Sequence, residues 1–339
     1  MITVLGEAVV RLAQTSDEMT VRALPGGSAL NIAIAAVRLG YPAALMARLS
    51  GDPFGQLLRR HAARNGVSLS AAPDADEPTT IEVLPDRGER GERGDRARLY
   101  LGGAASAPWS AADLARIPPV TKVLHIGSLA WCDGPSASRV LKTAGRLRRR
   151  GTLVSTDLNV RPEVMGSPGR ARILLDRAIR AADVIRASTE DVAWLHPGRA
   201  PQAVAEQWLA LGPGLVVMTS GRAGAMAFRG PGSVLHRPAY AGHGSDAAGT
   251  GDAFTAGLLG ALYRLGPDGG SVGDLGARDL ADVLDAACAA SGAASERAGA
   301  AGRGRAAGRS GAAPIGSAAA SMQAIHESLT GTGGLFPGR

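Results

Sequence analysis

Hydrophobic positions fall into short runs separated by stretches with helical spacing. Residues 2–10 form an apolar, β-branched run that predicts a strand. The helical pattern that comes next has Ser28 as its expected N-cap and Gly40 as its stop. Residues 42–49 predict a second strand, and a second helix is expected to end near Asn65.

After residue 120, strand and helix patterns alternate. The predicted strands are 123–126, 153–156, 184–187 and 215–219, and the predicted helices are 137–150, 169–182, a short one ending near 195, and 202–211. This alternation indicates an α/β fold with a doubly wound, mostly parallel sheet flanked by helices. Ligands on such sheets bind at the carboxyl ends of the strands. We therefore expect chemistry near 157–161, 188–191 and 219–221.

Two segments depart from the alternation. Between 78 and 103, β-like runs at 79–84 and 97–101 flank a polar loop of Gly-Glu-Arg repeats, which predicts an exposed hairpin. Toward the end of the chain, Ala, Gly, Arg and Ser dominate. We expect a folded domain over 1–298 and a poorly ordered tail over 299–339, with a short helix near 320–329.

Composition narrows the classes of function. The 339 residues include 37 Lys and Arg against 30 Asp and Glu, a net charge of +7, but the arginines are scattered and aromatic residues make up only 4%. Scattered charge with few stacking platforms argues against nucleic-acid binding. Cys132 and Cys288 lie far apart without metal-binding spacing, and neither a signal peptide nor a membrane span is recognisable. These features favour a cytoplasmic protein that does not bind membranes.

The segment Gly249-Thr250-Gly251-Asp252 carries the clearest chemistry. Small residues precede an apolar helix, so exposed N–H groups and the helix dipole can form an anion site. A carboxylate there repels an anion but can take a proton from an attacking hydroxyl, and phosphoryl transfer needs both functions. The alternative interpretation is an ordinary glycine turn with an aspartate N-cap. No Walker or dinucleotide-binding motif occurs in the sequence.

Five segments, in order, resemble those of the PfkB-type, ribokinase-like carbohydrate kinases, and the bacterial fructokinases most of all. They are residues 26–33, 51–55, 157–162, 217–225 and 246–252. The resemblance extends over roughly 2–297. It implies an ATP-dependent kinase that phosphorylates a small sugar, with fructose as the leading acceptor, and a small β-sheet lid formed by about 9–24 and 78–103 that also mediates homodimers.

The resemblance also implies roles for single residues. Asp252 would be the general base, and Gly249, Thr250 and Gly251 the anion hole. The sugar would contact Gly26, Gly27, Asn31, Arg161 and Arg11, and the nucleotide Asn159, Ser188, Thr219, Gly221 and Gly224. Mg²⁺ would be held near Asp191 or the adjacent Glu190, and Asp246 would help to hold a monovalent cation such as K⁺.

One departure leaves the acceptor open. Fructokinase-like chains carry Gly-Glu-x-x-x-Asp near the start, and its Asp binds sugar hydroxyls, whereas residues 6–11 here end in Arg11. A guanidinium only donates hydrogen bonds. A 2-keto-3-deoxy sugar acid, a nucleoside or a sugar-containing metabolite is therefore an alternative acceptor. A non-catalytic sugar- or nucleotide-binding sensor is a further alternative, although a silent protein has no need of Asp252. Asn31 as a core amide and Arg161 as a surface ion pair also stay open.

Overall fold

The computed structural model describes residues 1–15, 19–84, 97–106, 108–132, 134–240, 249–266 and 272–307. The chain divides into two compact units, Met1–Glu296 and Arg297–Arg339, and the elements described below belong to the first, apart from the C-terminal end of one helix. That helix, α10 (Ala277–Ala307), continues past residue 298, where we expected the folded domain to end. The expected domain boundary stays a prediction. The helix expected near 320–329 lies outside the described residues.

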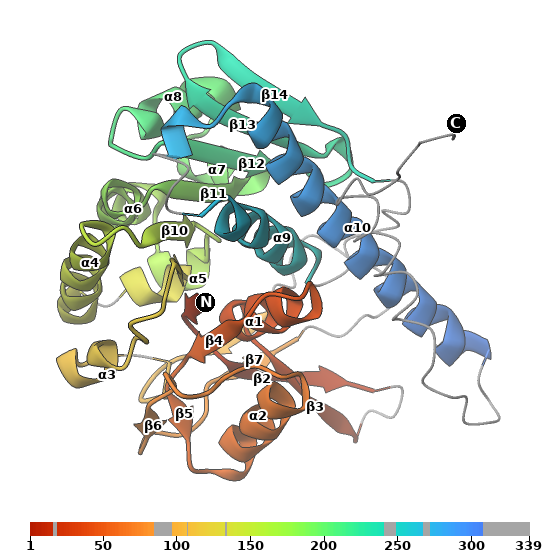
Figure 1. The fold of residues 1–339 in the computed structure, drawn as a ribbon. Coiled ribbons are helices and arrows are strands. Elements are labelled where there is room, and N and C mark those ends of the chain that lie inside the picture. The colour runs from red at the N-terminus through yellow and green to blue at the C-terminus, as the bar shows by residue number, and fades with distance from the viewer. Residues whose placement is uncertain are drawn as a thin grey trace, which may run out of the picture. The chain divides into compact units, whose positions relative to one another are not determined.

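An eight-stranded sheet forms the centre of the first unit, in the order β14-β13-β12-β11-β10-β9-β1-β4 (Figure 1). Its strands are β1 (Ile2–Leu5), β4 (Ala43–Met46), β9 (Val123–Ile126), β10 (Leu153–Asp157), β11 (Val184–Ser188), β12 (Leu215–Thr219), β13 (Ala225–Gly230) and β14 (Ser233–Arg237). The six strands β4, β1, β9, β10, β11 and β12 pair in parallel, and β13 and β14 add an antiparallel edge. The predicted doubly wound, mostly parallel α/β fold is confirmed. The hairpin β13–β14 was not predicted.

Helices cover both faces of this sheet (Figure 1). One face carries α4 (Gly134–Arg148), α6 (Pro168–Ala181), α7 (Thr189–Leu195) and α8 (Pro201–Leu209), and the other carries α1 (Ser28–Arg38), α9 (Thr250–Leu265) and α10. The first layer buries Trp131, Trp208 and Phe228, and the second buries aliphatic side chains such as Leu259 and Leu284. The shorter elements are α2 (Pro53–Arg64), α3 (Ala111–Ala115), α5 (Pro162–Met165), β5 (Leu49–Ser50) and β6 (Asp74–Ala75).

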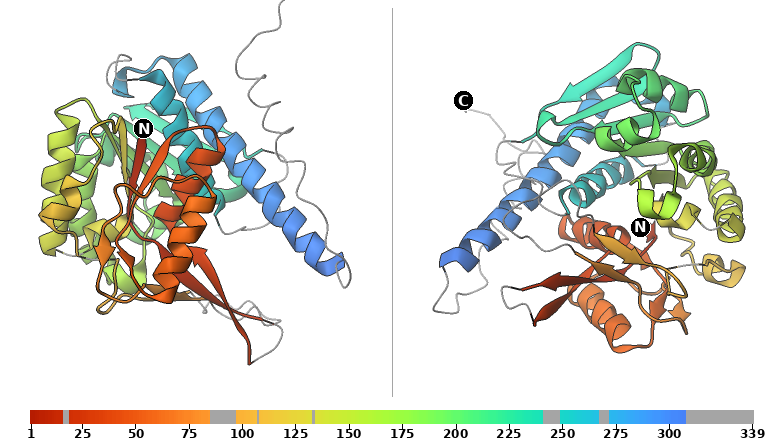
Figure 2. Two further views of the ribbon diagram at one scale, coloured as in Figure 1. Left: turned by 60° about the horizontal axis from the view of Figure 1, so that its bottom comes forward. Right: turned by 180° about the vertical axis from the view of Figure 1, so that it is seen from behind.

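A second sheet of four strands, called here the small sheet, stands apart from the main one (Figure 2). Its order is β3 (Val21–Gly26), β2 (Val9–Gln14), β7 (Ile81–Val83) and β8 (Arg98–Tyr100). The predicted hairpin is confirmed, since β7 and β8 pair antiparallel. The single strand expected over 2–10 is wrong, because the chain leaves the main sheet at Gly6 and β2 joins the small sheet. A Cβ at Gly6 would lie 2.9 Å from Ala29 Cβ, so α1 packs directly against this crossover.

The start of α1 also corrects the sequence-based expectation. Its N-cap is Gly27, with φ 103° and no side-chain cap, and Ser28 is the first helical residue. The Ser28 hydroxyl instead donates to Asp252, far along the chain. By contrast, α2 is capped by Asp52, which accepts from the Gly55 N–H. The local rule for serine at a helix start was overridden by a tertiary partner.

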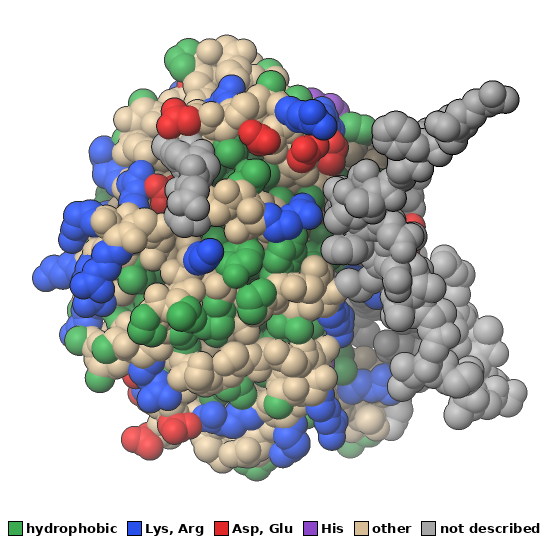
Figure 3. Space-filling view, viewed as in Figure 1, with side chains coloured by type: hydrophobic (Ala, Val, Ile, Leu, Met, Phe, Trp, Pro, Cys, Tyr) green, Lys and Arg blue, Asp and Glu red, His purple; other side chains and the backbone are tan. Residues whose placement is uncertain are grey.

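Three further observations concern the surface, the cysteines and the helices. Basic side chains are dispersed over the face in Figure 3 among acidic, apolar and neutral ones. Cys132 and Cys288 are both free of disulfides. No helix within the described ranges has the length and apolar character to cross a membrane.

Candidate active site

The candidate active site centres on Asp252 in the first turn of α9. Gly249 caps the helix in the left-handed region at φ 97°, with no side chain capping the first turn. The first N–H groups of a helix have no partner within it, and they carry the positive end of its dipole. Asp252 lies among them, and two side chains of α1 hold it. Ser28 Oγ donates to Oδ1 at 2.6 Å, and Asn31 Nδ2 donates to Oδ2 at 2.8 Å.

Opposing effects act on the protonation of Asp252. Burial raises its pKa, and the nearby Asp157 raises it further. Hydrogen bonds from Ser28 and Asn31, together with the charge of Arg11, lower it, but the net pKa is above the ordinary value. A carboxylate with a raised pKa is a stronger base than a free aspartate, provided that it stays ionised. The alternative interpretation of Asn31 as an amide buried in the core does not hold, because its Nδ2 donates to the candidate base Asp252.

Arg186 is a site residue that sequence reasoning missed. It extends from β11, is buried, and donates from Nη1 to Asp157 Oδ2 at 3.0 Å and from Nη2 to Thr219 Oγ1 at 2.7 Å. A Cβ on Gly251 would lie 3.2 Å from Arg186 Nη2, so the guanidinium packs against the first turn of α9. Although burial favours the neutral form, Asp157 and Asp191 raise the pKa of Arg186. An arginine inside the apolar run 184–187 was the available signal.

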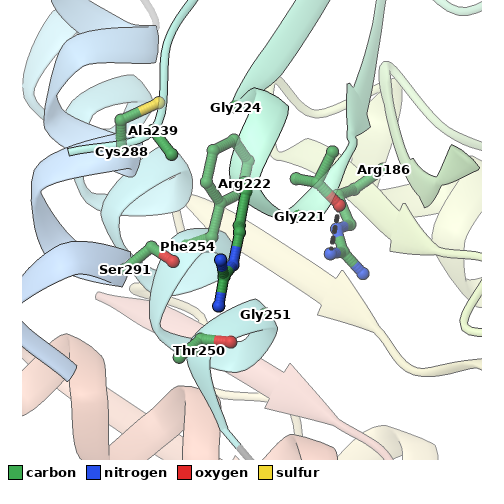
Figure 4. A pocket seen from close by; sticks show the side chains of 11 residues that line it. Arg186, Gly221, Arg222, Gly224, Ala239, Thr250, Gly251, Phe254, Cys288 and Ser291 are labelled. Atoms are coloured by element: carbon green, nitrogen blue, oxygen red, sulfur yellow. Dashed lines mark hydrogen bonds between the residues drawn. The ribbon is translucent and has the colours of Figure 1, made fainter. Parts of the chain in front are cut away.

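A cavity opens between β12, the start of α9 and α10 (Figure 4). Six residues of its lining had no role assigned from the sequence: Arg186, Arg222, Ala239, Phe254, Cys288 and Ser291. The full lining is Arg186, Thr219, Gly221, Arg222, Gly224, Ala239, Thr250, Gly251, Phe254, Cys288 and Ser291. The structure therefore brings the predicted nucleotide residues Thr219, Gly221 and Gly224 to one cavity with Thr250 and Gly251 of the predicted anion hole.

Gly224 has a structural reason for being glycine. Its φ is 93°, and a Cβ there would lie 2.0 Å from the carbonyl oxygen of Arg237 in β14. Only glycine fits this close approach at positive φ. At Gly221, with φ 47°, a Cβ would meet no atom within 4 Å.

On the other side of Asp252, the small sheet brings charged groups to the site. Arg11 in β2 donates from Nε to Glu82 Oε2 at 2.6 Å, and Arg161 Nη1 lies 3.5 Å from Glu82 Oε1. Glu82 is buried and faces Arg11 directly across the β2–β7 pair. A Cβ on Gly26 would lie 2.8 Å from Arg11 Nε, so the arginine lies across this glycine. Arg161 therefore belongs to an ion-pair cluster shared with the small sheet, and Glu82 was missed from the sequence.

Glu7 contacts the backbone of Gly27 and Ser28 at the start of α1. It is buried at 4% exposure, and its Oε1 accepts the Ser28 N–H at 3.1 Å. Its Oε2 has no hydrogen-bond partner among the described residues. Burial, the largest effect, raises the pKa of Glu7. Gly27 completes the turn, since a Cβ there would lie 2.6 Å from the Glu7 carbonyl oxygen.

The predicted metal residues lie at the start of α7. Asp191 forms a capping box with Ser188 and also accepts the Val160 N–H at 2.9 Å, so backbone groups already use both carboxylate oxygens. Burial raises the pKa of Asp191. Glu190 is exposed beside it. No group of three or more His, Cys, Asp or Glu is arranged to hold a metal ion in the part of the chain that the structure describes.

A metal that relies on substrate phosphates and water needs only one or two protein carboxylates, as Mg²⁺ usually does. Glu190 and Asp191 fit that requirement. Asn159 follows β10 with φ 29°, and its N–H donates to Asp157 Oδ1 at 3.2 Å. Asp246, expected at a monovalent cation, lies outside the described residues.

Comparison with known proteins agrees with this geometry. The profile of the pfkB family carbohydrate kinases matches residues 1–304. Fructokinase of Klebsiella pneumoniae is 33% identical over 275 residues, 79% of this chain and 86% of that protein. Aminoimidazole riboside kinase of Salmonella typhimurium is 27% identical over 78% of this chain and 81% of that protein. Fructokinase of Vibrio cholerae O395, solved with fructose, ADP and calcium ion, has a TM-score of 0.71 at 28% identity, covering 87% of this chain and 91% of that one.

Proposed function

Because the chain belongs to the pfkB family of carbohydrate kinases, and is therefore a phosphotransferase acting on an alcohol group, we propose that it transfers the γ-phosphate of ATP to a hydroxyl of a small sugar, with fructose the leading acceptor. The observation that carries this proposal is the position of Asp252. Its carboxylate is held by α1 at the N-terminus of α9, while Arg186 packs against Gly251 of the same turn.

In the proposed reaction, Asp252 takes the proton of the acceptor hydroxyl. The acceptor oxygen bonds to the γ-phosphorus, and the bond from that phosphorus to the bridging oxygen of ADP breaks. The N–H groups of 249–251 and the Arg186 guanidinium stabilise the negative charge of the transferring group. The proton then passes from Asp252 to solvent as the products leave.

The nucleotide is proposed to occupy the cavity lined by Thr219, Gly221 and Gly224 (Figure 4). Mg²⁺ supplies positive charge to the β- and γ-phosphates when bound. Glu190 and Asp191 would hold it through water, with Asn159 and Ser188 nearby. A monovalent cation such as K⁺ beside Asp246 belongs to the same proposal.

The small sheet is proposed to act as the lid over the acceptor, because it brings Arg11 and Glu82 to the site. Excluding water would limit wasteful hydrolysis of ATP.

The face of the small sheet opposite to Arg11 and Glu82 exposes Val21 (56%), Val83 (38%) and Tyr100 (54%). These three share a face because residues opposite one another in the strand pairs point to the same side of the sheet. We propose that this apolar face forms a homodimer, which Tyr100→Asp would dissociate in light-scattering measurements. The free cysteines are consistent with a proposed cytoplasmic location.

Asp252→Asn tests the proposal. An amide cannot take the proton, so kcat should fall roughly 10²–10⁴-fold with little change in acceptor affinity. ADP release would measure turnover, and calorimetry would measure acceptor binding. Full activity in Asp252→Asn refutes the assignment of the base. Ligand-induced stabilisation of the unmodified protein without any turnover would instead support a binding protein.

A second acceptor class is favoured by the two guanidiniums near the acceptor region. Arg11 and Arg161 both approach Glu82, and such donors suit a 2-keto-3-deoxy sugar acid, or another acceptor with an acidic group, better than a neutral ketose. An ADP-release screen across ketoses, aldoses, nucleosides and keto acids separates the two classes. Arg11→Gln should raise KM for an acidic acceptor and leave KM for ATP unchanged. Arg148→Gln, in an ion pair with Asp183, is the control. If fructose is preferred and Arg11→Gln changes nothing, the second class is wrong.

A further inference from the structure

The hydrogen bond between Ser28 and Asp252 joins two residues that are 224 positions apart and spans 2.6 Å. We propose that Ser28 is a positioning residue whose hydroxyl keeps Asp252 ionised and oriented for proton transfer. This inference rests on the proposed function, in which Asp252 is the general base.

The Ser28 hydroxyl is free for this role because the helix does not use it. Gly27 is the N-cap of α1, and no side chain caps the first turn. The backbone of Ser28 is held by the buried Glu7, because the Ser28 N–H donates to Glu7 Oε1 at 3.1 Å. Gly27 packs its backbone against Glu7 and Ala8 at a φ that only glycine adopts readily. The hydroxyl therefore projects from a turn whose backbone is held by the Ser28 N–H bond and by the close contacts of Gly27.

The bond changes the chemistry of Asp252 in a defined direction. Burial and the charge of Asp157 favour the neutral carboxyl, which cannot accept a proton, whereas the charge of Arg11 favours the ionised form. Glu7 and Arg186 also interact electrostatically with Asp252. A hydroxyl that donates to the carboxylate stabilises the ionised form, and short bonds to charged groups are the stronger ones. Asn31 does the same for the other oxygen. Each carboxylate oxygen has a second lone pair, so the acceptor hydroxyl can still donate to Asp252.

Orientation follows from the same two bonds. With Oδ1 held by Ser28 and Oδ2 by Asn31, the carboxylate cannot rotate about its terminal torsion without breaking one of them. The lone pairs that remain therefore point in fixed directions. A base whose free lone pairs are fixed needs less reorganisation when the hydroxyl arrives.

The test is the pH dependence of kcat/KM for the acceptor at saturating ATP, in the full-length chain. That profile reports the pKa of the free enzyme's base. In Ser28→Ala, the acid limb should move to higher pH by about one unit or more, because a hydrogen bond to the charged form has been lost. The plateau at higher pH should stay within about tenfold of the unmodified value, because the base itself remains. Ser28→Thr keeps the hydroxyl and should return the limb toward its original position.

Ser128→Ala is the matched control, because Ser128 is also buried and its hydroxyl has no hydrogen-bond partner among the described residues. Its profile should coincide with that of the unmodified protein. Should Ser28→Ala not fold, Ser28→Cys replaces it, since a thiol is a weak donor of similar size and should shift the limb in the same direction. An unchanged limb in the serine variant, with Asp252→Asn inactive, overturns the inference and leaves the proposed function standing. Full activity of Asp252→Asn overturns the proposed function itself.

Discussion

One set of variants at Arg186 separates its contribution to the stability of the fold from its contribution to turnover. Its guanidinium lies 3.0 Å from Asp157, and the two side chains are only 10% and 4% exposed. The Coulomb attraction at that distance is about 5 kcal/mol for an effective dielectric constant of about 20, before the cost of burial is subtracted. Arg186→Met leaves Asp157 buried without its cation. We expect the free energy of unfolding to fall by about 3–5 kcal/mol.

Adding Asp157→Asn to that variant removes the stranded charge. The asparagine carbonyl can still accept from the Asn159 N–H, and its NH2 group, in place of Oδ2, can donate to the Thr255 hydroxyl oxygen. The double variant should therefore regain about 2 kcal/mol or more relative to Arg186→Met. Turnover should not return, because the cation beside Gly251 is still missing, and loss of one such donor costs about 10²–10³-fold in kcat.

Urea denaturation measures stability, and ADP release measures turnover. Arg148→Met is the control for the loss of an arginine–aspartate pair, since Arg148 is 36% exposed and its pair with Asp183 should contribute only about 0–1 kcal/mol. The reasoning is refuted if the double variant is no more stable than Arg186→Met. It is equally refuted if Arg186→Met keeps normal turnover.

Three further predictions concern the surroundings of the site. Gly224→Ala should destabilise the fold by more than about 3 kcal/mol in urea melts, because strain at positive φ adds to a backbone clash; Gly221→Ala, with open space around its Cβ, should cost only about 1 kcal/mol and mainly raise KM for ATP. Burial raises the pKa of Glu7, so its contribution to stability is present below pH 4.5 and is lost as the pH rises through the folded pKa. Over that pH range, the free energy of unfolding of Glu7→Gln should rise relative to that of the unmodified protein. Parallel curves of unfolding free energy against pH would contradict this. Although burial raises the pKa of Asp52, hydrogen bonds from Thr79 and the Gly55 N–H lower it overall, so Asp52→Ala should lose about 1–2 kcal/mol at neutral pH, and the difference should shrink as the pH falls below 3.8.

The sequence was most informative where local pattern and tertiary environment agree. The strands β9 and β12 were predicted with their observed bounds, because buried parallel strands are continuous apolar runs. The run 2–10 was assigned to one strand because nothing in its hydrophobicity marks the change of sheet at Gly6. The hairpin β13–β14 was missed because its outer strand is largely exposed and lacks a strong apolar run.

The site shows the same division. The Gly-Thr-Gly-Asp segment was recognisable as a candidate anion site because the glycine turn and the free N–H groups of a helix start lie within one short stretch of sequence. Ser28, Glu82 and Arg186 were not recognised as site residues, because their roles depend on partners in other segments: Asp252, Arg11 and Asp157. An ion pair or hydrogen bond between distant segments has no periodic signature in the chain. The β2–β7 register, the β10–β11 register and the packing of α1 against α9 bring these groups together.

Under the proposed function, the first turn of α9 has to serve two groups that repel each other, the Asp252 carboxylate and a phosphate. The structure separates them by direction. Asp252 is held toward α1 by Ser28 and Asn31, whereas Arg186 packs on the Gly251 side, which faces the cavity (Figure 4). One side of the turn is therefore anionic and the other cationic. Under the proposed function, a hydroxyl bound at Asp252 and a phosphate bound beside Arg186 would approach each other across this turn, as in-line transfer requires.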